Sequence, residues 1–177
     1  MADTLMQLQV DPPTPTPTPV PLTMETYDGA CFNWFAWGGV ALAMTFSNLG
    51  TAYGTAKSGM GIASLSVTRP HLAFKSIIPI IMAGILSIYG LIISVLFSQK
   101  VIATGDQTAA LPLLYFFAGS LTGLSNVAAG YAIGVVGEQG VKFYAINEQI
   151  FVALILILIF SEVLGLFGMI TAIIMSI

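Results

Sequence analysis

The sequence is poor in charged residues. Asp, Glu, Lys and Arg together make up 7% of its 177 residues, whereas hydrophobic residues make up 56%. A chain with so few charges cannot cover a water-facing surface, and the mean hydropathy of +0.93 agrees. The basic residues form no dense cluster, so no nucleic-acid partner is expected. The composition predicts an integral membrane protein embedded in a lipid bilayer.

Cysteine is also scarce, since Cys31 is the only one in the chain. A single cysteine excludes a disulfide within the chain, and no His or Cys group surrounds it, so no metal site is expected. The sequence also lacks a glycine-rich loop followed by lysine, the pattern that cradles the phosphates of ATP. No soluble domain is present to hold such a loop. We therefore expect no metal, no cofactor and no ATP-hydrolysing centre in this chain.

Long apolar runs are what the sequence does contain, at residues 32–56, 76–97, 113–136 and 150–177. Each run is long enough for a helix that crosses a bilayer, so we predict an all-α membrane protein with four transmembrane helices. Residues 1–30 precede these runs and carry alternating Pro and Thr. Because such a segment favours extended polyproline II, we predict a disordered tail.

The loop between the first two apolar runs has no acidic residue, and its basic residues are Lys57, Arg69, His71 and Lys75. The other two loops combine acidic and basic residues. By the positive-inside rule, the first loop lies in the cytosol. The third loop is then on the same side, and the middle loop and both termini lie on the lumenal side.

The chain repeats itself when it is shifted by 78 residues without a gap. This repeat predicts two tandem helical hairpins of the same orientation, residues 31–100 and 101–177. One position differs in chemistry, because Gly84 in the first hairpin corresponds to Glu162 in the second. The matched pairs are Ser47 and Ser125, Asn48 and Asn126, Tyr53 and Tyr131, Gly59 and Gly137, Leu86 and Leu164, Gly90 and Gly168, and Ser98 and Ser176, with Tyr89 opposite Phe167.

The first and third runs carry small residues at steps of three or four, whereas Ile, Leu, Val and Phe dominate the second and fourth. Faces without large side chains let helix backbones approach closely in a membrane. We therefore expect the first and third helices to pack tightly on the inside of a larger assembly, and the second and fourth to face outward. Asn48 and Asn126 hold equivalent places on the inner helices and are expected to bridge helices by hydrogen bonds.

A single carboxylate, Glu162, lies inside the fourth apolar run. On a helix it is about 18 Å from Ile150, close to the midplane of a hydrocarbon layer about 30 Å thick. An ionised side chain there costs at least about 2.5 to 3.5 kcal/mol, so an acid in this place indicates a functional site. The alternative is a protonated Glu that serves only as a hydrogen-bond staple between helices.

Four motifs resemble the proteolipid c subunit of vacuolar-type proton ATPases: GTAYGTAKSG at 50–59, SIIPIIMAG at 76–84, IYGL at 88–91 and FSEVLGLFG at 160–168. The resemblance covers the chain from about residue 32 to the C-terminus, whereas the Pro-Thr tail does not belong to the pattern. In this family, four-helix subunits form a membrane ring. The ring turns against a stationary subunit and is driven by ATP hydrolysis elsewhere in the complex.

The resemblance implies that Glu162 is the proton-carrying glutamate and that Tyr89 lies near it. It implies as partners other proteolipid subunits in a ring, a stationary membrane subunit that supplies an Arg, and a central-stalk subunit on the cytosolic face. The expected location is a vacuolar or other endomembrane. Because no Arg or Lys lies in any of the apolar runs, the positive charge that favours the carboxylate must come from another subunit.

Tyr89 and Ser161 are the candidates to hydrogen-bond the protonated form of Glu162. The alternative for Tyr89 is an aromatic side chain that only fills space. A low dielectric favours the neutral acid where the site faces lipid. A sodium site would need several oxygen ligands around the acid, yet the equivalent Gly84 offers no side chain and the flanks of the acid are apolar. The expected cargo is therefore a proton.

The sequence thus predicts a proton-carrying rotor subunit, in which reversible protonation of Glu162 couples ring rotation to transmembrane proton transport. The alternative is a pore-forming or structural membrane proteolipid. The expected place of Glu162 on a bulky outer helix disfavours a polar central pore. A secondary transporter is a third class, but such proteins usually need more spans and more intramembrane polar residues than one acid and two Asn.

Overall fold

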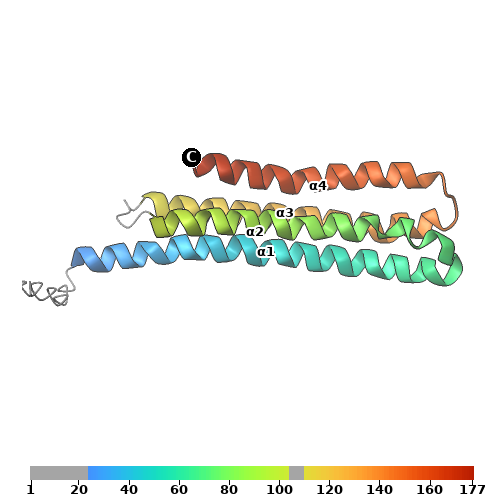
Figure 1. Cartoon of the computed structure of the whole chain (residues 1–177), viewed down its shortest axis with the longest axis horizontal. Helices are drawn as coiled ribbons and strands as arrows, with labels where there is room; N and C mark the ends of the chain where they lie inside the picture. The colour runs from blue at the N-terminus through green and yellow to red at the C-terminus, as the bar shows by residue number, and fades with distance from the viewer. Residues whose placement is uncertain (1–23, 104–109) are drawn as a thin grey trace, which may run out of the picture.

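The computed structural model describes the backbone of residues 24–103 and 110–177. They form four α-helices, α1 (Met24–Thr68), α2 (Ile78–Ala103), α3 (Ala110–Tyr144) and α4 (Ile150–Met175), with the short 3-10 helices η1 (Pro70–Leu72) and η2 (Lys75–Ile77) between α1 and α2. The four long helices run side by side along one axis, with α1 and α4 on opposite sides of the bundle (Figure 1). The predicted all-α architecture is confirmed.

The helix ends follow prolines rather than the ends of the apolar runs. α1 continues well beyond the first apolar run and ends at Thr68, two residues before Pro70. Arg69, which precedes this proline, has φ −142° and ψ 81° and is therefore not helical. A proline disfavours the helical conformation of the residue before it. Pro79 and Pro112 lie in the first turns of α2 and α3, where a backbone N–H would have no helical partner. The helices are therefore longer than the apolar segments they contain.

The start of α1 differs from the expected tail boundary. α1 begins at Met24, so residues 24–30, which the sequence assigned to the tail, are helical. The last proline of the tail is Pro21, and no proline after it interrupts the backbone until Pro70. The rest of the expected disordered tail, residues 1–23, lies outside the described residues, as do residues 104–109 of the middle loop.

Three of the described helical segments are long and apolar enough to cross a membrane, namely Lys75–Ile102, Leu111–Tyr144 and Ile150–Met175. The protein is therefore an integral membrane protein. α1 is the longest helix, but Gly, Ala, Ser and Thr make up much of its sequence and keep it less apolar. Its length alone does not make α1 a fourth span.

The small residues of α1 and α3 face each other. Gly39 lies against the backbone of Tyr115, and Gly119 lies against Gly39. Near the middle of the two helices, Gly50 and Gly130 meet backbone to backbone. A Cβ atom on any of these glycines would overlap main-chain atoms of the other helix. The close packing expected of the two small-residue helices is therefore present.

Two clusters of buried apolar side chains join the first hairpin, α1 and α2, to the second, α3 and α4. Each cluster takes side chains from both hairpins, so the two hairpins form one bundle. One cluster includes Leu65, Leu86, Ile133, Tyr144 and Leu158, and the other includes Ile93, Phe97, Tyr115, Ala118 and Ala172.

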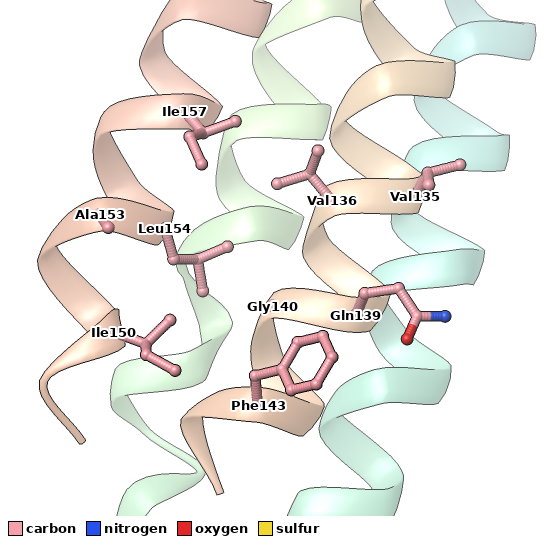
Figure 2. A pocket seen from close by; sticks show the side chains of 9 residues that line it. All are labelled: Val135, Val136, Gln139, Gly140, Phe143, Ile150, Ala153, Leu154 and Ile157. Carbon is pink, nitrogen blue, oxygen red and sulfur yellow. The ribbon is translucent and has the colours of Figure 1, made fainter. Parts of the chain in front are cut away.

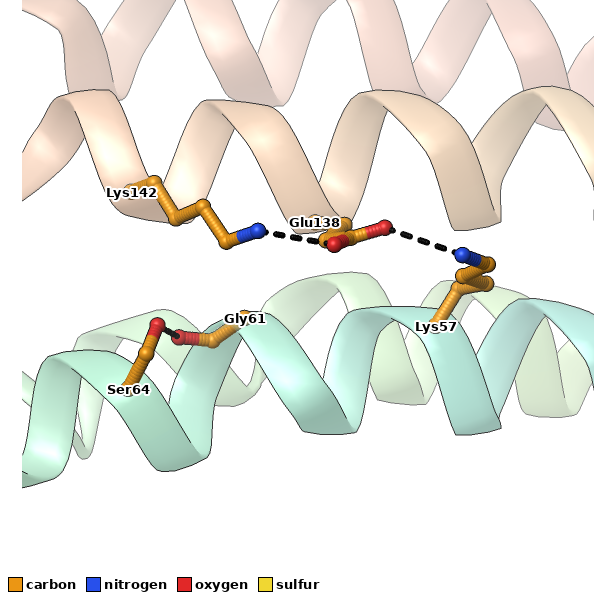
Figure 3. A network of polar contacts seen from close by, with 5 residues as sticks. All are labelled: Lys57, Gly61, Ser64, Glu138 and Lys142. Atoms are coloured by element: carbon orange, nitrogen blue, oxygen red, sulfur yellow. Dashed lines mark hydrogen bonds and ion pairs between the residues drawn. The ribbon is translucent and has the colours of Figure 1, made fainter.

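An ion network joins α1 to α3 near the end of α3 (Figure 3). Glu138 accepts from Lys142 at 2.7 Å, one turn further along α3, and lies 3.4 Å from the ammonium group of Lys57 on α1. The sequence placed Glu138 and Lys142 in a loop, but α3 continues to Tyr144 and both are helical. Because Lys57 and Lys142 are partly exposed, each contact contributes little to stability. The network orients α1 against α3 at this end.

Candidate functional site

Glu162 lies close to the middle of α4, about 18 Å from Ile150 and about 20 Å from Met175 along the helix axis. Its side chain is neither buried nor fully exposed. The bulky residues on either side, Phe160 and Leu164, are exposed on the bundle surface. The acid is thus at the depth of a bilayer midplane and at the edge of the bundle, rather than in a sealed core.

Tyr89 provides the hydrogen bond to this acid. Its hydroxyl donates to Glu162 Oε1 at 2.9 Å. Tyr89 lies on α2 and its ring packs against the cluster that contains Leu86, so the hydroxyl is held at a defined place. The contact crosses from the first hairpin to the second. The structure therefore brings together two candidate residues that are 73 positions apart.

Ser161, the third candidate, is directed elsewhere. Its hydroxyl donates to the carbonyl of Ile157 at 3.0 Å, one turn earlier on α4. This bond within one helix is the common choice of a serine in a helix interior. Ser161 is next to Glu162 in sequence, but its hydroxyl is not bonded to the carboxyl group.

The chain has five Lys and Arg residues, and none of them lies near Glu162. Lys57 and Lys142 belong to the network at the end of α3, and Lys100 near the end of α2 donates to the carbonyl of Ser176. Arg69 and Lys75 lie in the connection between α1 and α2. Within one chain, no positive charge is available to hold the carboxylate ionised.

The described residues contain no group of three or more His, Cys, Asp or Glu side chains that could hold a metal ion. At the site itself, the only side-chain oxygen bonded to Glu162 among these residues is the hydroxyl of Tyr89. A hard cation needs several oxygen ligands, whereas a proton needs only the carboxyl group and a neighbour to orient it. The arrangement can therefore bind and release a proton.

Asn126 on α3 supports the bundle behind the site. Its side chain is 0% exposed, and Nδ2 donates to Ser47 Oγ on α1 at 2.7 Å and to the carbonyl of Leu86 on α2 at 3.3 Å. A Cβ atom on Gly165 of α4 would come within 2.7 Å of Asn126 Oδ1, so this glycine makes room for the amide. The expected bridging by Asn126 is present, and one amide ties three helices together.

Two further hydroxyl groups connect α3 to α4 and were not singled out from the sequence. Ser125 donates to the carbonyl of Leu164 at 2.6 Å, and Thr122 donates to the carbonyl of Gly168 at 3.3 Å. Both acceptors follow Glu162 on α4. The signal that could have found them is their spacing, because Thr122 and Ser125 are three residues apart on one helix and therefore lie on the same face of it. These bonds fix the position of the α4 segment that carries the acid.

Comparison with known proteins identifies the family. The chain matches the family model of the ATP synthase C subunit over residues 38–97 and again over residues 116–175. The 16 kDa proteolipid c subunit of the V-type proton ATPase of Rattus norvegicus is 54% identical over 138 residues, which are 78% of this chain and 88% of that protein. The chain belongs to the family of V-type proton ATPase proteolipid c subunits.

Other members of the family match over a similar length. The 16 kDa proteolipid c subunit of Homo sapiens is 52% identical over 144 residues, 81% of this chain and 92% of that protein. The c′ subunit of the V-type proton ATPase of Candida glabrata is 47% identical over 142 residues, 80% of this chain and 87% of that protein. The two segments that match the family model are offset by 78 residues, the same shift that aligns the repeat in the sequence.

Proposed function

We propose that this chain is the proton-carrying subunit of the rotor ring of a V-type ATPase, and that Glu162 is the proton carrier. The observation that carries the proposal is a lone acid at mid-helix, at the edge of the bundle, whose carboxyl group accepts a hydrogen bond from Tyr89. Membership of the V-type proteolipid family supports the same reading. An ionisable group at this depth is expensive unless its charge changes with its surroundings.

The protonation cycle follows from the dielectric around the acid. Where Glu162 faces lipid, the low dielectric favours the neutral carboxylic acid. Tyr89 then donates to one carboxyl oxygen while the other carries the proton. Tyr89 is a positioning residue, since it orients the group in both protonation states without itself exchanging a proton.

Release of the proton requires a positive charge or a path to water. The basic residues of this chain lie away from Glu162, so the charge must come from another subunit. We assign this role to an Arg on the stationary membrane subunit. When rotation brings Glu162 beside that Arg, the carboxylate becomes the favoured form and the proton leaves to the water path.

The assembly that this mechanism needs is a ring. In it, α1 and α3 with their glycine contacts form the inner layer, and α2 and α4 form the outer layer that carries the acid. α1 is then a fourth span, sheltered from lipid by the rest of the ring. The double match to one family model supports a duplicated hairpin, with residues 31–100 and 101–177 as the two units.

The proposed orientation places the basic connection between α1 and α2 in the cytosol, where the central-stalk subunit would contact the ring. Both termini then lie on the lumenal side of a vacuolar or other endomembrane. The pore-forming alternative receives no support from the geometry, because Glu162 lies on α4 rather than on the glycine-lined contact of α1 and α3.

The experiment that tests the proposal is the substitution Glu162→Gln in the assembled complex. Gln keeps the length of the side chain and can still accept from Tyr89, so assembly should be unchanged. Because an amide cannot exchange a proton in this way, ATP-driven acidification of membrane vesicles should fall to background. Continued acidification by a complex that contains only the variant would refute the proposal.

A further inference from the structure

The buried amide of Asn126 has an oxygen atom that no donor reaches. Nδ2 donates one hydrogen bond to Ser47 Oγ and one to the carbonyl of Leu86. Because a carbonyl can only accept, Nδ2 must face Leu86 and Oδ1 must face the other way. Oδ1 is buried, and nothing in the described part of the chain donates to it. An acceptor left unpaired in a protein interior is unfavourable, so Oδ1 requires a donor.

This oxygen is directed at the segment of α4 that carries the acid. A Cβ atom on Gly165 would lie 2.7 Å from Asn126 Oδ1, and Gly165 follows Glu162 by three residues. Residues three apart on a helix lie on the same face, with Cβ atoms about 5 to 6 Å apart. Oδ1 is therefore within reach of the carboxyl group of Glu162, either directly or through one water molecule.

Asn126 also contacts the helix that carries the donor to the acid. Leu86, whose carbonyl accepts from Asn126, precedes Tyr89 by three residues on α2. The amide on α3 thus contacts α2 one turn from Tyr89 and faces α4 one turn from Glu162. It lies behind the hydrogen bond that joins these two side chains.

The protonated acid needs an acceptor. Tyr89 donates to Glu162 Oε1, so the proton of the neutral acid lies on the other carboxyl oxygen. An O–H group that faces hydrocarbon without an acceptor is unfavourable. The acid therefore has a donor to place, and Asn126 has an acceptor to fill.

The other side of the acid, toward the α3–α4 connection, is apolar. A groove of about 330 Å³ lies there between α3 and α4, with Val136 and Ile157 in its lining (Figure 2). Gln139 is part of this lining, but its side chain points away from α4 in Figure 2. Gln139 is also about 15 Å along α3 from Ala129, the α3 residue beside Gly165. The groove thus offers no acceptor to Glu162.

From these contacts we infer that Asn126 Oδ1 is the acceptor for the proton that Glu162 carries while it faces lipid. The O–H of the neutral acid donates toward Oδ1, whereas the ionised carboxylate has no hydrogen to donate. Asn126 therefore stabilises only the protonated state, whereas Tyr89 can donate to both states. The inference rests on the proposed function, in which Glu162 carries the transported proton, and it adds the group that holds that proton in transit.

The other titratable groups of the bundle leave this contact to the two residues. From α2, Tyr89 faces the acid and donates to it. On α1 and α3, the charged side chains Lys57, Glu138 and Lys142 form the network near the end of α3. On α4, the acid is the one charged residue of the helix.

Carbodiimide labelling of Glu162 across a range of pH tests the inference in the intact complex, because the reagent reacts with protonated carboxyl groups. Asn126→Leu and Asn126→Ser both remove Oδ1. The serine is small, and its hydroxyl can bond to its own helix. At the alkaline end of the profile, where protonation is incomplete, labelling should be about 5-fold slower in either variant, as expected for one lost hydrogen bond. At the acid end, where every copy is protonated, the rates should equal that of the unmodified chain.

Two control variants keep Oδ1 in the chain. Ser47→Ala removes an acceptor of the Asn126 amide, so it weakens the same contact between helices without removing Oδ1. Asn48→Leu changes the repeat partner of Asn126, which is exposed in the single chain. Both variants should give the labelling profile of the unmodified chain.

The outcomes separate this inference from the proposed function. Labelling profiles of the Asn126 variants that match the unmodified chain at every pH would overturn the inference. An equally large change in Ser47→Ala would also overturn it, because a loosened bundle would then explain the effect. If the profiles are unchanged while Glu162→Gln abolishes acidification, only the role of Asn126 is refuted. Continued acidification by Glu162→Gln would refute the rotor function and, with it, the transported proton that Asn126 is inferred to hold.

Discussion

The two hairpins of this protein are built on one repeat, but only the second carries an acid. In the first hairpin, Gly84 leaves an open space on α2, and Tyr89 reaches out of that helix toward the other hairpin. In the second hairpin, Glu162 is the residue equivalent to Gly84, and its carboxyl group accepts a hydrogen bond from the hydroxyl of Tyr89. One copy of the repeat thus supplies the carboxyl group, and the other supplies the hydroxyl that donates to it.

The two hairpins also differ in which of their equivalent residues are buried. The equivalent residues Asn48 and Asn126 differ in exposure. Asn126 faces the other hairpin, whereas Asn48 faces the outside of the chain. The exposure of a polar residue in one hairpin can therefore be compared with that of the equivalent residue in the other. The comparison makes specific predictions, because a change at one position has a matched control at the other.

The largest effect is expected at the closest helix contact. Gly50→Val would place a side chain where the main chain of Asn126 already lies, and the backbone cannot yield as a side chain could. Overpacking alone costs about 1 to 3 kcal/mol, and a backbone obstacle raises this, so α1 and α3 should separate and little folded subunit should accumulate. The measurement is the amount of folded, isolated subunit that is recovered from the membrane in detergent.

The matched control for that change is Ala128→Val at the repeat partner of Gly50. Ala128 is exposed in the single chain, so the isolated subunit should fold normally. Equal recovery of the two variants would contradict the claim that α1 and α3 pack through their backbones.

A smaller effect is expected from the amides. Asn126→Leu removes both hydrogen bonds of the side chain and leaves Ser47 and the carbonyl of Leu86 buried without that partner. Hydrogen bonds between membrane helices are worth about 0.6 kcal/mol on average and at most about 1.7 kcal/mol, so the isolated subunit should lose about 1 to 2 kcal/mol. Thermal unfolding of the subunit in detergent measures this loss.

Asn48→Leu sharpens the comparison, because Asn48 is exposed in the single chain. The isolated Asn48→Leu subunit should therefore unfold at the same temperature as the unmodified chain. A loss of stability in the isolated subunit as large as that of Asn126→Leu would show that burial in the single chain does not distinguish the two amides.

The next effect concerns the hydroxyl at the acid. Tyr89→Phe removes the donor to Glu162 while keeping the ring in its cluster. A net hydrogen bond of about 1 kcal/mol corresponds to about a 5-fold change, so acidification should slow by about that factor without stopping. Phe167→Tyr, at the repeat partner, should leave the rate unchanged because Gly84 offers no acceptor side chain. Initial rates of vesicle acidification, measured with equal amounts of each variant in the membrane, test both changes.

Complete loss of acidification in Tyr89→Phe would mean that the hydroxyl does more than position the acid. An unchanged rate would mean that the hydrogen bond has no part in the cycle.

The smallest effect is expected at Ser161. Its hydroxyl bonds to Ile157 within α4, so Ser161→Ala should change stability by no more than about 0.5 kcal/mol and leave acidification unchanged. The same acidification assay measures it beside Tyr89→Phe. A defect larger than that of Tyr89→Phe would show that Ser161, rather than Tyr89, supports Glu162.

Much of the fold could be predicted from hydropathy, because three of the apolar runs dominate long helices and the lone acid within one of them is visible in the sequence. The repeat was visible as well, and it identified the positions that matter, including Asn126 and Gly84. These features depend on residue type and spacing, which a sequence displays directly.

The remaining features depend on local geometry. The end of α1 is set by Pro70, and its start at Met24 follows the end of the proline run, neither of which a count of apolar residues detects. The sequence offered both Ser161 and Tyr89 as hydrogen-bond donors to Glu162, and the resemblance implied that Tyr89 lies near it. Ser161 satisfies its hydroxyl on its own helix, whereas Tyr89 is long enough to cross from α2 to α4.

The central claim is that one carboxyl group in the lipid belt takes up and releases the transported proton. A carbodiimide that reacts with protonated carboxyl groups in an apolar environment tests it in the intact complex, with mass spectrometry of the chain and acidification measured on the same sample. We predict that the modified residue is Glu162 and that acidification falls in proportion to its modification. Acidification that continues when Glu162 is fully modified, or that stops while Glu162 remains unmodified, would contradict the account.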